Sequence, residues 1–360
     1  MFDRRSKRTL LLLASLFVWL PGTTHAQLVL KNEDASLRVG IASQIWGNWS
    51  ETSSGQSGYQ QTFFLRRLRL MASADIGKDV SFFVETDAPR LGANPKNLST
   101  GFILQDAMLE WKPRNQIQLA AGLFVAPFTR VGLQSISNYY ALDFGAIAAV
   151  PNGPTQTSAL RDVGFQLKGF FLDDRFQYRV GAFDGQRDAN GRNSLRTSAY
   201  FQYNIYGREK GYALTGTALG KQKIWAIDAG IDAQSTYRGY SANTALDLPV
   251  NGGDEIGAQF QYIFYDGRTK FPTIGRQNDY LVEAAYYIRA AKLQPFFKYE
   301  TQQFTVNQSN NTQRTGFGAN YYIHGQNLKW TVQYQRFKPG LGSTLRACND
   351  LTAQLQFMYW

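Results

Sequence analysis

The sequence predicts an all-β fold, a transmembrane antiparallel β-barrel of about sixteen strands. Segment after segment alternates apolar and polar residues with a period of two, the pattern of a strand with one face in an apolar medium and the other in water. The connections between these segments alternate between tight turns and long polar loops, as in outer-membrane barrels. Aromatic residues make up 14% of the chain beside 33 glycines, which suits strands and turns better than helices.

Residues 1–26 have the features of a secretory signal peptide. A basic start (Arg4, Arg5, Lys7 and Arg8) precedes an apolar run over 10–20 and small residues at 24–26, so we expect cleavage after about Ala26. The alternative is a membrane anchor, but the apolar run is shorter than the ~20 residues that span a bilayer. Residues 27–360 are then the barrel, with 34 basic (38 − 4) and 26 acidic (27 − 1) residues and a net charge of +8.

Few residues remain for catalysis or metal binding. After the leader, the chain has one histidine, His324, and one cysteine, Cys348. No intramolecular disulfide and no Cys-rich metal site can form, and a Ser–His–acid arrangement has only one histidine to draw on. We therefore expect no enzyme, no catalytic residue, no metal and no cofactor. An exported basic protein rarely meets nucleic acid, so an anionic solute, lipid or lipopolysaccharide is the expected partner.

The first five strands are expected before a long interruption. Leu37, Val39 and Ile41 share one face of the first, and Leu68, Leu70 and Ala72 share one face of the second. Each apolar set is opposed by polar residues, as a strand between lipid and water requires. The five ranges are 37–49, 63–76, 80–87, 102–112 and 116–124.

Five more strands follow the interruption. Val163, Phe165 and Leu167 alternate with polar residues, and Trp225 and Ile227 begin a similar series. The alternation is weakest in the last of the five. The ranges are 162–171, 175–183, 197–206, 223–235 and 239–249.

The C-terminal third alternates most regularly. Phe260, Tyr262 and Phe264 share one face, and Leu355 and Phe357 do so in the final strand. The apolar face of that strand ends at Tyr359, one residue before Trp360, so the register of the closing aromatic is shifted. The six ranges are 255–265, 279–289, 292–302, 314–323, 328–337 and 350–360.

The connection lengths place both ends of the barrel on the rim with short turns. Tight turns rich in Gly, Asp and Asn are expected near residues 77, 114, 173, 290 and 325. Longer polar loops lie between them, over 50–61, 88–101, 125–161, 184–196, 266–278, 303–313 and 338–349. The stretch 206–222 breaks the alternation, because it is long where a short turn is expected, and the connection after residue 235 is short. A secreted β-sandwich or propeller is the alternative fold, but its outward faces should be polar.

Basic residues on the polar face would line the lumen. Rings of Arg and Lys lower the barrier for anions, although the same residues could simply solvate the wall beside its carboxylates. Two more arginines belong to a long loop at about 125–161, which could fold inward and narrow the channel or lie on the surface. The candidate lining residues are Arg67, Arg69, Arg130, Arg161, Lys168, Arg179, Lys298, Arg314 and Lys329.

The densest basic segment is Phe64-Leu65-Arg66-Arg67-Leu68-Arg69-Leu70. Alternation places Arg67 and Arg69 together on the lumen side, about 6–7 Å apart, as a step for a phosphate or carboxylate. Arg66 is expected to point outward, near the headgroup rim.

The chain resembles the phosphate-selective porin O/P family over essentially all of its mature length. The resemblance is carried by the basic segment Phe64–Leu70, by Gly122–Phe128, by Arg161–Gly164 and by the closing aromatic residue. The resemblance implies a sixteen-stranded, trimeric outer-membrane barrel that carries anions or other small polar solutes. We thus expect passive diffusion of small, phosphate-like anions. The alternatives are a general or neutral-solute porin and, in another class, a structural or adhesion barrel.

Overall fold

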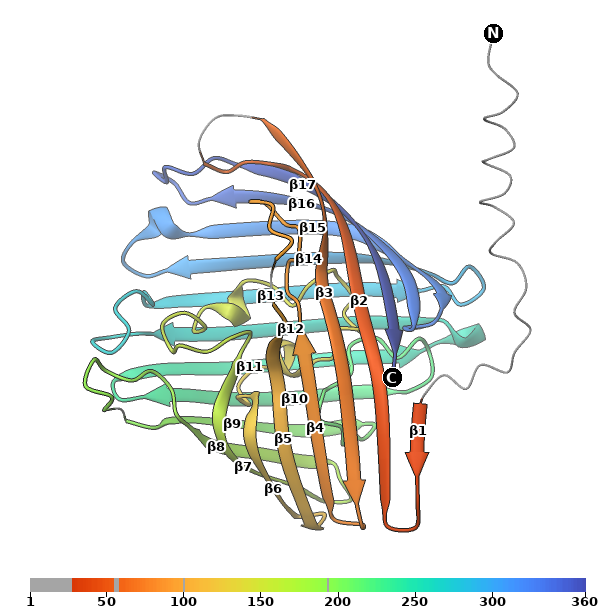
Figure 1. Ribbon diagram of the computed structural model, residues 1–360. Helices are drawn as coiled ribbons and strands as arrows, with labels where there is room; N and C mark the ends of the chain where they lie inside the picture. The colour runs from red at the N-terminus through yellow and green to blue at the C-terminus, as the bar shows by residue number, and fades with distance from the viewer. Residues whose placement is uncertain (1–27, 55–57, 100, 193) are drawn as a thin grey trace.

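The computed structural model describes residues 28–54, 58–99, 101–192 and 194–360. The expected leader, residues 1–26, lies outside the described residues. Sixteen antiparallel strands close into one barrel, which confirms the predicted fold class (Figure 1). The barrel closes where the last strand pairs with the first wall strand, from Asp350 opposite Ser50 to Tyr359 opposite Ile41.

Every wall strand overlaps one of the sixteen predicted ranges, because a period of two is a local property that sequence reports directly. The strands are β2 (Ala35–Glu51), β3 (Tyr59–Ile76), β4 (Val80–Asp87), β5 (Ile103–Arg114), β6 (Ile117–Val125), β7 (Arg161–Phe171), β8 (Phe176–Phe183), β9 (Arg196–Tyr206), β10 (Ile224–Gln234), β11 (Tyr237–Pro249), β12 (Glu255–Asp266), β13 (Gln277–Tyr287), β14 (Leu293–Phe304), β15 (Thr312–His324), β16 (Leu328–Pro339) and β17 (Cys348–Tyr359). A short extra strand, β1 (Leu28–Lys31), was not predicted. It pairs with residues 36–39 of β2, next to the stretch that pairs with β17.

The wall is apolar outside and polar inside. In β7, Val163 and Phe165 are exposed, whereas Gln166 and Lys168 on the opposite parity are buried. A face of exposed Val, Phe and Leu suits lipid, and closure pairs the strand edges that lipid could not hydrogen-bond. The alternate residues whose side chains point into the barrel therefore line the lumen.

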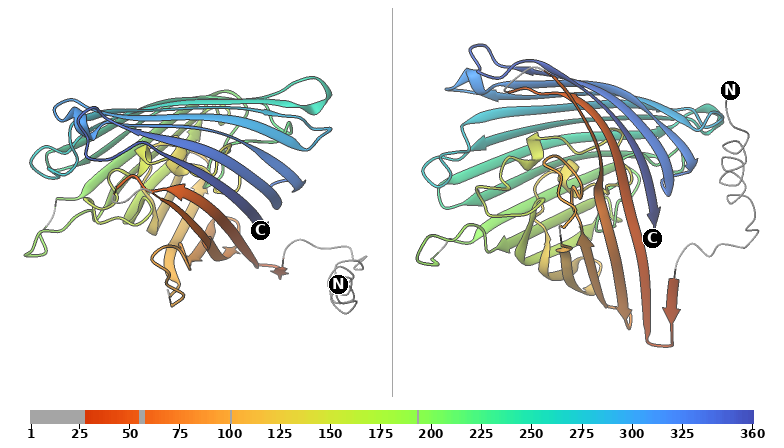
Figure 2. Two further views of the ribbon diagram at one scale, coloured as in Figure 1. Left: turned by 90° about the horizontal axis from the view of Figure 1, so that it is seen from above. Right: turned by 45° about the horizontal axis from the view of Figure 1, so that its top comes forward.

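Two segments from opposite rims fill much of the lumen. From the long-loop rim, residues 126–160 pass inside the barrel and carry α2 (Arg130–Leu133) and the 3-10 turn η2 (Ile147–Ala149) (Figure 2). Phe128, Val131 and Ile147 of this inner loop pack with Tyr265 and Leu281 of the wall. From the short-turn rim, residues 207–223 also turn inward, which accounts for the unexpected length of this connection. Two further 3-10 turns, η3 (Asn251–Gly253) and η4 (Gln308–Asn310), lie in connections between strands.

Within the described part of the chain, no helix is both long and apolar enough to cross a membrane.

Candidate functional site: a two-piece constriction and the passage beside it

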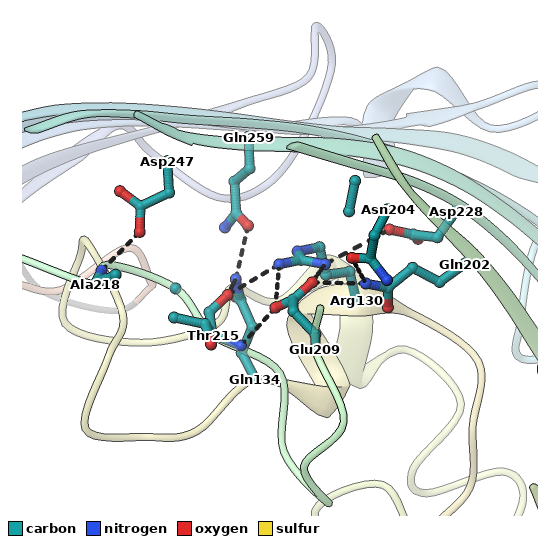
Figure 3. Close-up of polar contacts among 12 residues, drawn as sticks. Arg130, Gln134, Gln202, Asn204, Glu209, Thr215, Ala218, Asp228, Asp247 and Gln259 are labelled. Carbon is teal, nitrogen blue, oxygen red and sulfur yellow. Dashed lines mark hydrogen bonds and ion pairs between the residues drawn. The ribbon is translucent and has the colours of Figure 1, made fainter. Parts of the chain in front are cut away.

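The inner loop (126–160) and the inner turn (207–223) bind each other. The backbone N–H of Leu214 donates to the Leu133 carbonyl at 2.8 Å, and the Ser135 N–H donates to the Leu214 carbonyl at 3.1 Å. Arg130 donates from both terminal nitrogens to the Glu209 carboxylate, each at 2.9 Å, and also to the Thr215 carbonyl at 3.0 Å (Figure 3). The two segments thus form one obstruction built from both rims.

Wall residues hold the inner turn from the other side. The carboxylate of Asp247 accepts from the Ala218 N–H at 2.6 Å (Figure 3), and Glu255 accepts from the Thr217 hydroxyl at 2.6 Å. Arg179, one of the predicted lining residues, donates to the carbonyls of Tyr212 and Gly211 at 2.8 and 3.0 Å. The turn therefore has both charged and backbone anchors, and Arg179 serves as one of them.

A β-bulge anchors the inner loop to β3. Gln44 pairs with Arg67 and Ile45 with Leu65, so Arg66 has no partner on β2 and its side chain turns inward. Both Arg66 and Arg67 then bind the Asp143 carboxylate, Arg67 at 2.8 Å. The expectation that Arg66 points outward is wrong, because the extra residue of a bulge interrupts strict alternation.

The charge of Asp143 depends on these two arginines. Burial raises the pKa of the Asp143 carboxyl, but the attraction of Arg67 and Arg66 outweighs burial and holds that pKa well below its usual range. The carboxylate is ionised under all ordinary conditions. It cancels one of the two arginine charges and leaves the group with a net charge of +1.

Two adjoining cavities, which together we call the passage, lie between this obstruction and the wall formed by β3 to β7. One cavity of about 340 Å³ lies toward the long-loop rim, and a second of about 590 Å³ reaches the short-turn rim. Because the two cavities share part of their lining, they adjoin. The shared residues are Arg69, Gln134, Ile136, Arg161, Tyr212 and Ala213.

The arginines at this junction are paired with carboxylates. Arg69 contacts Glu85 at 2.7 Å and Asp87 at 3.1 Å. Arg161 contacts Asp106 at 3.1 Å, and the Tyr212 hydroxyl donates to the same carboxylate at 2.7 Å. Two positive and three negative charges therefore meet at the junction of the two cavities, which leaves its local field weak.

Over its whole length the passage is more basic than its junction. The residues that line the two cavities include eight basic and five acidic side chains. The basic ones are Arg38, Arg66, Arg67, Arg69, Lys112, Arg161, Lys168 and Lys210. Two more carboxylates, Asp143 and Asp174, lie outside the lining and pair with lining residues, so the net charge with these partners is +1 (8 − 7).

Four of the nine predicted lining residues border this passage: Arg67, Arg69, Arg161 and Lys168. Lys168 is paired with Glu110 at 2.7 Å. Arg130 and Arg179 are buried in the anchors of the obstruction. Lys329 donates to the Ser137 carbonyl of the inner loop at 2.9 Å.

Lys298 and Arg314 border a different cavity of about 360 Å³ near the long-loop rim. Lys298 donates to the Asp143 carbonyl at 2.7 Å, and Arg314 donates to Glu300 at 3.1 Å. Lys298 therefore holds the inner loop directly, and Arg314 holds it through Glu300, which accepts from the Ala146 N–H at 3.1 Å.

Sequence reasoning missed four basic residues of the passage: Arg38, Arg66, Lys112 and Lys210. Arg38 alternates with Leu37 and Val39, so the period of two could have found it. Arg66 and Lys210 could not be found in this way, since a bulge and an inward turn leave no periodic signal. Among the described residues, no group of three or more His, Cys, Asp or Glu side chains is placed to hold a metal ion.

Solved structures of the same fold come from several bacteria. An anion-selective porin from Comamonas acidovorans aligns with a TM-score of 0.63 and 11% identity, over 91% of this chain and all of that one. OmpF of Salmonella typhi aligns with a TM-score of 0.60 and 12% identity, over 92% of this chain and all of that one. A trimer form of OmpT from Vibrio cholerae aligns with a TM-score of 0.53 and 12% identity, over 90% and 99% of the two chains. At such low identity these likenesses establish the fold.

A comparison with curated protein sequences found no match. A family model described as phosphate-selective porin O and P matches residues 39–294, which is most of the chain, from β2 to the start of β14. The matched region includes the basic segment of β3, the inner loop, the inner turn and every residue at the junction. The chain therefore belongs to the phosphate-selective porin O and P family.

Proposed function

We propose that this protein is an outer-membrane porin through which small polar solutes diffuse passively, with a modest preference for anions. The passage between the two-piece obstruction and β3–β7 is the route. The observation that carries the preference is the excess of basic side chains along the lining, a net charge of +1 once Asp143 and Asp174 are counted, since positive walls raise the local concentration of anions and lower that of cations. The Comamonas protein of the same fold is described as anion-selective.

The paired arginines favour weak selectivity over a dedicated phosphate site. Arg69 and Arg161 already satisfy carboxylates, so a phosphate would have to compete with Glu85, Asp87 and Asp106 for their donors. A general porin with little charge preference is therefore the second candidate, and a channel for neutral solutes belongs to the same class. A structural or adhesion barrel remains the candidate of another class, and it would not conduct.

The protein would be exported to the outer membrane and would assemble there as a trimer. Cleavage after about Ala26 would release the barrel for the outer membrane, where lipid and lipopolysaccharide would surround it. A trimer is consistent with the family and with the trimer form of Vibrio cholerae OmpT. A passive channel requires no catalytic residue, cofactor, metal or nucleic acid.

Reversal potentials in planar bilayers under a KCl gradient test the proposal. We expect the sign for chloride preference, and phosphate should block the chloride current only weakly. Arg69→Gln should shift the reversal potential toward cations, because Glu85 and Asp87 lose their counter-charge, whereas Glu85→Gln should shift it toward anions. Arg187→Gln, on the exposed long-loop rim, is the matched control. Cation preference would refute the anion proposal, and absence of conductance would refute the porin itself.

A further inference from the structure

The cavity at the short-turn rim, which we call the short-turn vestibule, has an apolar wall inside a polar lumen. Elsewhere the inner parity carries polar residues, such as Thr352, Gln354 and Gln356 of β17. At the vestibule the inward-facing positions become apolar. In β17 and just after it they are Met358 and Trp360, and in β3 the inward-facing Arg69 is followed by Met71. The apolar side chains of the vestibule wall are Met71, Phe83, Met108, Phe170, Met358 and Trp360.

Every methionine of the chain except Met1 lines this one cavity. Methionine is flexible and polarisable, and it makes favourable contacts with aromatic rings of varied shape. Three methionines and three aromatic rings around about 590 Å³ provide an adaptable apolar surface of the size of a small-molecule site.

The closing aromatic is part of this wall. The Trp360 ring lies edge-on to Phe83 with centroids 5.7 Å apart, and Phe83 in turn lies 5.9 Å from Tyr212 of the inner turn. Gly40 makes room for Trp360, because a Cβ at position 40 would lie 2.4 Å from the indole. The shifted register seen in the sequence thus places Trp360 in the lumen mouth.

Basic side chains face the same cavity beside the rings. The guanidinium of Arg38 lies 5.9 Å from the centre of the Trp360 ring, and the Lys210 ammonium lies 5.5 Å from that of Phe170. Arg38 makes no ion pair with any residue that the structure describes. Lys112 and Lys168 share the single carboxylate of Glu110, at 3.0 and 2.7 Å, so one of their two charges is uncompensated.

Strand register brings the charge and the rings to one level. Arg38 pairs with Ser73, Ser73 with Phe83, and Phe83 with Met108, so these four side chains form a row across β2 to β5. The vestibule lining carries six basic and four acidic side chains, and Asp87 and Asp174 outside the lining pair with Arg69 and Lys210. The cavity as a whole is therefore close to neutral, and its positive charge is concentrated at Arg38. An aromatic acid whose ring packs against Phe83 and Met108 would therefore have its carboxylate near Arg38.

We propose that the short-turn vestibule is a binding site for small aromatic carboxylates, anions that carry a ring beside the charge. The proposal rests on the proposed function, because the ligand reaches the vestibule through the passage. Apolar contact of the ring adds to an attraction that any small anion shares, so an aromatic acid should bind about tenfold more tightly than an aliphatic one of equal charge.

Single-channel chloride current in planar bilayers tests the site, with sodium benzoate as the probe. Sodium acetate supplies the charge without the ring, and benzyl alcohol supplies the ring without the charge. We expect benzoate to halve the current at about a tenth of the acetate concentration, with benzyl alcohol weaker than benzoate. Equal blocking by benzoate and acetate, or by benzoate and benzyl alcohol, would overturn the proposal and leave the porin function intact. Absence of any chloride current would instead refute the porin function and the site with it.

Two variants localise the effect. Phe83→Thr should bring the benzoate-to-acetate ratio close to one, and Arg38→Gln should weaken block by both anions. Val84→Thr, on the lipid side of the same strand, is the matched control and should keep the wild-type ratio. An unchanged ratio in Phe83→Thr would show that benzoate binds elsewhere and would overturn the assignment. Chloride conductance of each variant, measured first, reports whether it has folded and inserted.

Discussion

Arg130 and Glu209 meet inside the barrel through two parallel hydrogen bonds of 2.9 Å, although they enter from opposite rims. Arg130 belongs to the inner loop and Glu209 to the inner turn, and both side chains are almost completely buried. A paired geometry of this kind adds directional specificity to the charge attraction. It makes the position of each segment depend on the other.

Glu209→Gln should destabilise the barrel strongly. Removing one partner leaves the Arg130 charge buried, with only Asp228 at 4.0 Å nearby, and such losses cost about 3–5 kcal/mol. Urea unfolding of the protein in lipid vesicles, followed by tryptophan fluorescence, measures the free energy of unfolding. Arg130→Gln combined with Glu209→Gln should recover part of the loss. Lys210→Gln, which removes an exposed pair with Asp174, should change stability by no more than about 1 kcal/mol. A Glu209→Gln variant as stable as wild type would contradict the assigned role.

Asp143→Asn should increase anion selectivity. The substitution removes the one negative charge that Arg66 and Arg67 share, so the long-loop side of the passage gains a positive charge. The reversal potential under a KCl gradient should move further toward chloride. Asp188→Asn, at an exposed position between β8 and β9, is the control. A shift toward cations would contradict the assigned role of Asp143, because Arg66 and Arg67 belong to the wall strand β3 and keep their charges in the variant.

Acid should leave the Asp143 anchor in place. A carboxyl whose pKa is lowered in the folded state contributes stability at pH values above its unfolded pKa, and this stability is lost only as pH falls through the folded pKa. The folded pKa of Asp143 lies well below the ordinary value of 3.8. Between about pH 7 and pH 5, the Asp143→Asn variant and wild type should keep a constant difference in reversal potential. A difference that disappears within this interval would show that Asp143 takes up a proton there.

Shortening the inner turn should widen the channel. Replacing residues 208–222 by Asn-Gly removes one of the two pieces of the obstruction, and the Arg130→Gln background removes the buried charge that would lose Glu209. Single-channel conductance should rise about twofold or more, since current through a water-filled pore grows with its open cross-section. Shortening the 340–347 loop, which lies at the long-loop rim, should leave conductance near the wild-type value. Unchanged conductance in the shortened turn would place the narrowest point elsewhere.

The strands of the barrel wall could be predicted from the sequence, because each position of a strand faces either lipid or water and its residue type reflects that environment. Val163, Phe165 and Leu167 show their environment without reference to any other strand. The sixteen strands and the inner parity of Arg67 and Arg69 follow from this local rule. The same rule would have predicted Arg38 as a lining residue, since Arg38 alternates with Leu37 and Val39.

The constriction could not be derived in the same way, since its contacts join residues far apart in the chain. Arg130 and Glu209 are 79 positions apart, and Arg67 and Asp143 are 76 apart. The alternation of residues near Arg66 does not predict the bulge that turns its side chain inward. Strand β1 has only four residues, too few for alternation to identify it. Which cations are neutralised, and hence how selective the channel is, depends on those distant pairs.

The vestibule takes side chains from both ends of the folded chain, Arg38 in the first wall strand and Trp360 as the last residue. Neither contribution is in place until β17 has joined β2, so a sheet that has not yet closed lacks this cavity. Capture of an aromatic acid would thus report completed assembly. Residues added after position 360 would begin inside the mouth of the channel, where an affinity tag would occupy the space left for a solute.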